Sequence, residues 1–148
     1  MMEEEKMSAE ENANIVREHY SAFNKRDFGY GATLVDPKVR WTNIPFATTY
    51  EGPEGYKAFL KMWTTAFSDA RIEITNLIAS GDWVTVEFTE KGTHQSGPLI
   101  GPKGSIPPTG KSIDLSFCEI FKLKNGKISL ARLYFDAATM LRQLEKIP

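Results

Sequence analysis

The chain has 148 residues, of which 41% are hydrophobic and 25% charged, a composition typical of one globular domain rather than a disordered chain. Its 18 Lys and Arg residues nearly balance 19 Asp and Glu, which argues against nucleic acid or an anionic membrane surface as a partner. The single cysteine, Cys118, excludes an intrachain disulfide. The acidic N-terminus and the lack of a long apolar run predict a cytoplasmic protein without a membrane span.

The first predicted element is a helix near the N-terminus. Residues 1–7 have the composition of a disordered tail. Ser8 and Glu11 then form a capping box, in which each side chain satisfies a free backbone N–H. Apolar residues recur at helical spacing from there to about Arg26. A shorter turn is expected over 31–35 and should stop at the following Asp-Pro pair.

A brief strand and a second long helix are predicted next. Residues 39–43 alternate in polarity as a strand does. Gly52 and Pro53 open the helix, because proline is well tolerated in a first helical turn. Its apolar stripe runs from Tyr56 to Phe67.

After residue 70 the hydrophobic period changes from helical to two, which is typical of antiparallel strands. Segments 71–79 and 83–94 predict one hairpin, and 112–123 with 127–135 predict another. The Asn125–Gly126 pair between the second two favours the positive φ angles of a tight turn. Since a closing helix follows, the sequence predicts an α+β fold in one domain, 1–148, with a curved antiparallel sheet wrapped around the helices.

Residues 95–110 do not fit short connections. This segment carries four glycines and four prolines in 16 residues, which predicts irregular structure. We interpret it as a lid or rim over a cavity. The alternative is a long hairpin loop that packs on the surface or against a second subunit.

Most catalytic motifs are absent. The TGKS sequence at 109–112 lacks the upstream glycine of a phosphate-binding loop and leads into a strand-like segment. His19 and His94 are the only histidines and have no metal-binding spacing, so we expect neither a metal site nor another cofactor. Acid–base chemistry by side chains in a cavity remains.

Asp136 is the main candidate for such chemistry. It follows the last strand, where alternation places Arg132 and Tyr134 on its side and Leu133 and Phe135 on the other. Next to apolar walls its pKa would rise toward that of a useful base, whereas Arg132 within reach would oppose that rise, and the sequence does not decide between the two effects. The alternative is that Asp136 is the N-cap of the closing helix, and both roles are compatible.

Several stretches together resemble the SnoaL-like polyketide cyclases, within the nuclear-transport-factor-two-like superfamily that includes ketosteroid isomerase. They are HYSAFNKRD (19–27), YEGPEGYKAFLKMW (50–63), AFSDARIEI (66–74), KGTHQSGPL (91–99), PPTGKSIDLSFCEIFKLKNGKI (107–128) and the C-terminal YFDAATMLRQLEKIP. The resemblance implies a cone-shaped α+β barrel, in which the bent sheet surrounds about three helices and leaves an internal apolar pocket. It also implies a homodimer packed through the sheet. Members commonly have glycine where this chain has Glu145, so the last helix is expected to end differently.

The resemblance also implies a reaction. An aspartate matching Asp136 acts as general acid/base in characterised cyclases, which close a ring by intramolecular aldol condensation of a polyketide ester without a cofactor. The expected substrate is a small apolar molecule with several carbonyl groups. Those cyclases use a histidine near the aspartate, for which only His94 is a candidate here. The other candidate pocket residues, as oxyanion donors, walls or neighbours of Asp136, are Tyr20, Trp41, Asn43, Trp63, Phe88, Phe117, Arg132 and Tyr134.

Four alternatives stay open. Allylic isomerisation of the ketosteroid isomerase kind would use the same base on one carbonyl. Epoxide hydrolysis would need an Asp–Arg–Asp set such as Asp136, Arg132 and Asp114. A binding module would hold an apolar ligand without turnover. A scaffold would use the outer face of the sheet and would have a filled cone with no cavity of ligand size.

Overall fold

The computed structural model describes residues 7–148, so most of the predicted disordered tail lies outside the described residues. The helices are α1 (Ala9–Lys25), α2 (Phe28–Ala32), α3 (Gly52–Ala66) and α4 (Ala137–Gln143). The strands are β1 (Val35–Asn43), β2 (Thr48–Glu51), β3 (Arg71–Ser80), β4 (Trp83–Thr93), β5 (Leu99–Gly101), β6 (Gly104–Ile106), β7 (Ser112–Lys124) and β8 (Lys127–Phe135).

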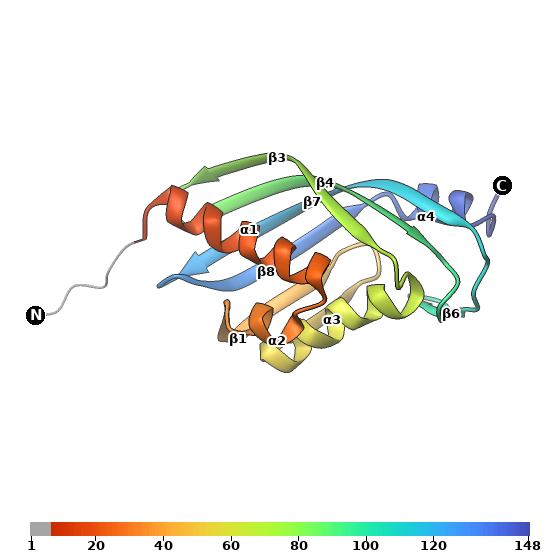
Figure 1. The fold of residues 1–148 in the computed structure, drawn as a ribbon, viewed down its shortest axis with the longest axis horizontal. Coiled ribbons are helices and arrows are strands. Elements are labelled where there is room, and N and C mark those ends of the chain that lie inside the picture. Colours follow the sequence, from red (N-terminus) through yellow and green to blue (C-terminus); the bar gives the residue numbers. More distant parts are fainter. Residues whose placement is uncertain (1–6) are drawn as a thin grey trace, which may run out of the picture.

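Six strands form one curled sheet in the order β2-β1-β8-β7-β4-β3. Helices α1 and α3 lie against one face of this sheet (Figure 1). Every neighbouring pair is antiparallel except β1 and β8, which run parallel because the chain crosses the molecule between them. The predicted α+β fold with a curved sheet around helices is therefore confirmed, with one parallel pair that the sequence did not indicate.

Local signals fixed the helices and hairpins. Ser8 and Glu11 make the predicted capping box of α1. Asn125 and Gly126 both have positive φ, +50° and +73°, in the turn between β7 and β8. These elements follow from side-chain capping and backbone preference, which need no distant partner. The predicted helix at Gly52 begins at that residue.

Three local predictions were wrong. The short turn after α1 is α2, which ends at Ala32, and β1 then runs from Val35 through Pro37 instead of starting at 39. Pro37 is tolerated because the pairing of β1 with β8 is irregular between Val35 and Arg40, so no ladder hydrogen bond is lost there. The segment 95–110 is not wholly irregular either, since it contains the small β5–β6 hairpin.

Helix α4 ends with the backbone geometry of a helix that is followed by glycine, although residue 145 is a glutamate. Glu145 has φ +57°, a left-handed conformation, and the backbone N–H of Lys146 donates to the carbonyl of Leu141 at 2.8 Å. A side chain in this conformation is strained by its Cβ. The helix therefore ends with the backbone geometry expected for glycine, and the expectation of a different helix end is wrong. The glutamate at this position adds backbone strain instead.

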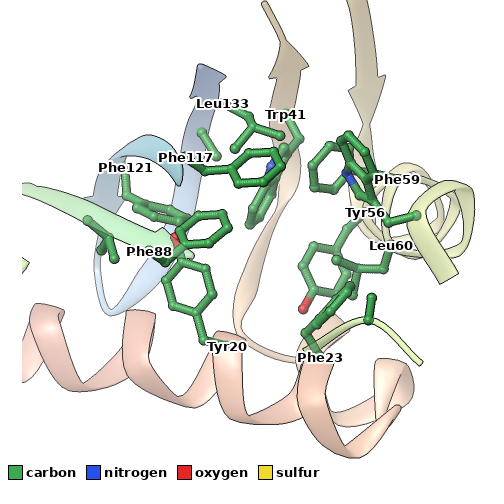
Figure 2. Packing of buried hydrophobic residues seen from close by; sticks show 14 of the residues in the cluster. Tyr20, Phe23, Trp41, Tyr56, Phe59, Leu60, Phe88, Phe117, Phe121 and Leu133 are labelled. Atoms are coloured by element: carbon green, nitrogen blue, oxygen red, sulfur yellow. The ribbon is translucent and has the colours of Figure 1, made fainter. Parts of the chain in front are cut away.

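The two sides of the sheet have opposite characters. On β4 and β7 every second residue points toward the helices and is buried, while the residues between face outward. Aromatic side chains from α1, α3 and the sheet fill the interior (Figure 2). Within residues 7–148 no helix is both long and apolar enough to cross a membrane.

Candidate functional site

Asp136 lies on the surface at the start of α4. Its Oδ1 accepts the backbone N–H of Thr139 at 3.1 Å, and its Oδ2 accepts the Thr139 hydroxyl at 2.7 Å. These hydrogen bonds hold the pKa of Asp136 below its usual value, and the side chain is exposed. The expectation of a sheltered carboxyl with a raised pKa is wrong for this structure, because the outer side of β8 continues into Asp136.

The neighbours predicted for Asp136 are on the same outer side. Tyr134 is 39% exposed, and the Arg132 guanidinium carbon lies 5.9 Å from the centre of the Trp83 ring. Asp114 is exposed and pairs with Lys91 at 3.8 Å. Arg132 is opposite Ile120, six residues along β7 from Asp114. The Asp–Arg–Asp set for epoxide hydrolysis is therefore not enclosed in a cavity.

His94, the candidate histidine partner of Asp136, is enclosed by the fold. Its side chain is fully buried at the base of the segment that carries β5 and β6, with its ring 5.4 Å from that of Phe67. Nδ1 is 3.2 Å from the Thr109 hydroxyl. Asn43 is also buried, but its Oδ1 accepts the backbone N–H of Phe46 in the turn after β1. Neither residue lines the central cavity described below.

The aromatic candidates do gather inside. Tyr20, Phe88 and Phe117 lie close together, with the two phenyl rings stacked at 5.1 Å (Figure 2). Trp63 meets Phe117 edge to face at 5.9 Å. Trp41 is fully buried. Tyr20, Trp63, Phe88 and Phe117 line one small central cavity, whereas Trp41 does not, and their role in binding a substrate stays a prediction. Close to them lie two buried carboxyl groups that the sequence analysis missed.

Glu119 is one of those groups. It is 2% exposed, its Oε1 accepts the Tyr20 hydroxyl at 2.7 Å, and its Oε2 accepts the Trp41 indole N–H at 3.0 Å. Burial raises the pKa of Glu119 to about 7, although both hydrogen bonds oppose the shift. Burial and the Glu119 charge raise the pKa of Tyr20. Glu119 is thus a carboxyl held in place by two neutral donors.

Glu90 is the second group, and it differs in having no hydrogen-bond partner among the described residues. Glu90 is 3% exposed on β4. Phe88 and Phe117 are paired across the antiparallel strands β4 and β7, and each glutamate follows its phenylalanine by two residues. The two glutamates therefore lie on opposite sides of this phenylalanine pair. Burial, and secondarily the charge of Glu119, raise the pKa of Glu90 to about 8, with a smaller opposing effect of Arg26. A buried carboxyl without a partner is costly and marks a candidate site.

A signal for both glutamates was present in the sequence. Along β4, Glu90 continues the alternation of Val86 and Phe88, and along β7, Glu119 stands between Phe117 and Phe121. A glutamate in phase with inward apolar residues points into the core. Such a residue is rarely buried without a function or a partner.

Both glutamates border one central cavity of about 20 Å³, whose wall also contains His19, Tyr20 and apolar residues such as Phe88 and Phe117. This volume accommodates about one water molecule. The expected pocket is therefore present only as a small cavity with a mainly apolar wall and two carboxyl groups at its border. A larger open hollow of about 600 Å³ lies along β3, β4 and β7; Asp114 borders it, but none of the candidate residues of the predicted apolar pocket does. No cluster of metal-binding side chains occurs in residues 7–148.

The structure is thus an α+β fold in which a curled sheet packs around helices, with two buried carboxyl groups in its core. The chain belongs to the SnoaL-like polyketide cyclase family, whose model matches residues 13–144. It matches no curated protein.

Similar solved structures share this fold. An NTF2-like protein of unknown function from Burkholderia pseudomallei is 28% identical, with a TM-score of 0.73 over 93% of this chain and 98% of that one. IdmH from Streptomyces antibioticus, a proposed polyketide cyclase, is 22% identical, with a TM-score of 0.75 over 90% and 98%. A protein with a ketosteroid isomerase-like fold from Catenulispora acidiphila is 16% identical, with a TM-score of 0.73 over 90% and 97%.

Proposed function

We propose that this chain is a cofactor-independent acid/base enzyme that acts on a small apolar molecule with more than one carbonyl group. The observation that carries this proposal is the unpaired carboxyl of Glu90 beside an aromatic cavity. Family membership supports intramolecular aldol ring closure as the reaction. Glu90 takes the role that the sequence analysis gave to Asp136.

In the proposed mechanism, ionised Glu90 removes a proton from the carbon next to a carbonyl group. The resulting enolate carbon attacks a second carbonyl of the same molecule, which forms the carbon–carbon bond. Protonated Glu90 then returns the proton to the new alkoxide, so the enzyme ends unchanged. A base with a pKa near the operating pH suits this cycle, and such bases contribute about 10²–10⁴-fold.

The size of the cavity sets a condition on this mechanism. Because the cavity accommodates about one water molecule, the reacting end of a substrate must displace wall side chains. The wall consists mainly of apolar side chains such as Phe88, Phe117 and Trp63, which favours an apolar substrate. Glu119 is fixed by Tyr20 and Trp41, so it serves to orient Tyr20.

Turnover of a panel of β-keto esters tests the proposal. Glu90→Gln keeps the shape of the side chain but removes the base, and should lower kcat/KM by about 10²–10⁴-fold. Asp136→Asn is the matched control and should leave activity within a few-fold, since asparagine also caps a helix. Mass spectrometry and NMR of the product separate ring closure from isomerisation, which forms no carbon–carbon bond. Equal activity of Glu90→Gln and wild type would contradict the proposal.

The small cavity also supports a second candidate, a scaffold that uses the outer face of the sheet. We propose that this face binds a second copy of the chain. The face exposes the apolar side chains of Ile78 (60%) and Trp83 (41%). It also carries an acidic residue, Glu87, and a basic one, Arg132. The Nε atom of Arg132 is buried and has no hydrogen-bond partner in the described residues. A surface with apolar residues and both charges can be complementary to itself across a two-fold axis.

Light scattering of Ile78→Glu tests this interface. The variant should be monomeric at concentrations where the wild type is a dimer. Ile100→Glu is the matched control, because Ile100 is similarly exposed (54%) on β5, away from the six-stranded sheet. A wild-type monomer, or equal effects of both variants, would contradict the homodimer.

A further inference from the structure

His19 lies next to the proposed reaction site, and the mechanism above leaves it unused. It is buried on α1 and forms part of the cavity wall with Tyr20 and both glutamates. The centres of the Tyr20 and Trp41 rings are each 4.8 Å from the centre of its ring. The imidazole therefore has a fixed orientation inside the fold.

Tyr56 holds one nitrogen of this ring. The Tyr56 oxygen is 2.8 Å from Nδ1 of His19, and the tyrosine is fully buried on α3. Its hydroxyl is seated against Gly31, where an added Cβ would be 2.3 Å from the oxygen. The position of the hydroxyl is thus set by backbone packing, and Gly31 is the residue that leaves room for it.

The contact with Tyr56 selects the tautomer of His19. If Nδ1 carried the proton, the buried Tyr56 hydroxyl would have no acceptor in the described part of the chain. If the hydroxyl donates to Nδ1, both groups are satisfied and the histidine proton lies on Nε2. Burial also lowers the pKa of His19 to about 3, so the ring is neutral near pH 7.

The second ring nitrogen of His19, Nε2, is the one that Tyr56 does not hold. Within residues 7–148, Nε2 has no hydrogen-bond partner. Other protein atoms do not cover it completely, in contrast to the buried unpaired atoms such as Nε2 of His94. Since His19 is a buried residue in the cavity wall, this atom borders the cavity. An N–H donor is therefore available next to Glu119 and Tyr20.

We propose that the Nε2–H of neutral His19 donates a hydrogen bond to the substrate oxygen that becomes negatively charged, a role that rests on the proposed function. Glu90 removes the proton from carbon, the enolate oxygen accepts the hydrogen bond from His19, and no proton leaves the imidazole. A neutral imidazole is a suitable donor because it stabilises an oxyanion without introducing a full charge. Tyr56 is the positioning residue that keeps this donor in place.

NMR of protein labelled with ¹⁵N-histidine tests the tautomer without any substrate. Only His94 competes for assignment, and a His94→Gln spectrum removes it. The expected result for His19 is a proton on Nε2 and none on Nδ1 from pH 5 to pH 8. In Tyr56→Phe the spectrum should change to a mixture of tautomers. A proton on Nδ1 in the wild type, or an unchanged spectrum in Tyr56→Phe, would overturn the inference.

Turnover of the β-keto esters tests the role of the donor. His19→Phe keeps an aromatic ring but removes the donor, and should lower kcat by about 10²–10³-fold with KM changed only a few-fold. His19→Gln keeps an N–H donor and should retain activity within about ten-fold of wild type. Equal losses in both variants would overturn the inference. Wild-type activity of Glu90→Gln would instead refute the proposed function, while the tautomer measurement would stand.

Discussion

Asp136, which directly follows strand β8, and Glu90, which lies on strand β4, are carboxylic acids with opposite surroundings. Asp136 ends the outward side of β8, where hydrogen bonds from Thr139 hold its pKa low. Glu90 lies on the inward side of β4, where burial raises its pKa to about 8. The comparison teaches that the side of a strand decides whether a carboxyl caps a helix or is available for proton transfer, since adjacent positions point to opposite environments.

The largest expected effect is on the pH dependence of stability. Glu90 has a higher pKa in the folded protein than the usual 4.5, so the folded state binds more protons than the unfolded state between those values. Stability should therefore be fully present below about pH 4.5 and fall as the pH rises through about 8, by roughly 3–4 kcal/mol between pH 5 and pH 8 from Glu90 alone. Urea denaturation at pH 5 and pH 8 measures this fall.

Glu90→Gln sharpens that test. Glutamine resembles the protonated acid, so the variant should match wild type at pH 5 and be the more stable protein at pH 8. Asp136 has the opposite sign, because its lowered pKa contributes stability that is lost as pH falls through the acid range. A Glu90→Gln variant with the same pH dependence as wild type would break the comparison.

The next effect concerns the hydroxyl that holds Glu119. Tyr20→Phe removes a donor that favours the ionised form of Glu119, so the pKa of Glu119 should rise further. The variant should lose about 1–3 kcal/mol at pH 8 and less at pH 5. Tyr56→Phe is the control, because it removes a hydroxyl bonded to neutral His19 and should cost the same at both pH values. A pH-independent loss in Tyr20→Phe would contradict the prediction.

A smaller effect is expected at the other end of the comparison. Asp136→Ala removes the N-cap of α4 and should cost about 0.5–2 kcal/mol in urea denaturation at pH 7. Asp136→Asn keeps a capping oxygen, so its loss of unfolding free energy should be much smaller than that of Asp136→Ala. If both variants were equally destabilised, the negative charge rather than the cap would be the source of stability.

The smallest effect is a gain. Glu145→Gly relieves a left-handed conformation at the end of α4 and should stabilise the protein by about 0.5–1 kcal/mol, measured by thermal unfolding. Lys146→Gly is the control, because that residue is not among those with positive φ. A loss of stability in Glu145→Gly would mean that the ion pair of Glu145 with Lys111, at 3.4 Å, outweighs the strain.

Much of the fold was predictable because its signals are local. The capping box of α1 and the Asn125–Gly126 turn depend on residues close in sequence, and the structure has both. The strand β2 was missed because its short, mostly exposed sequence has no alternation to detect. The β5–β6 hairpin was missed because glycine and proline indicate loops on average but are compatible with three-residue strands.

The sequence by itself determined which residues share a side of each strand. Because side chains alternate along any strand, the sequence put Leu133 on the opposite side of its strand from Asp136. For the same reason it put Glu90 on the same side as Phe88. Only the tertiary structure decided which side faces the helices, since that depends on how the sheet curls around α1 and α3. The same packing brought Tyr20 and Trp41 to Glu119 from two other elements, 99 and 78 residues away in sequence. Burial, and with it the pKa of each carboxyl, is a property of that assembly and not of any segment.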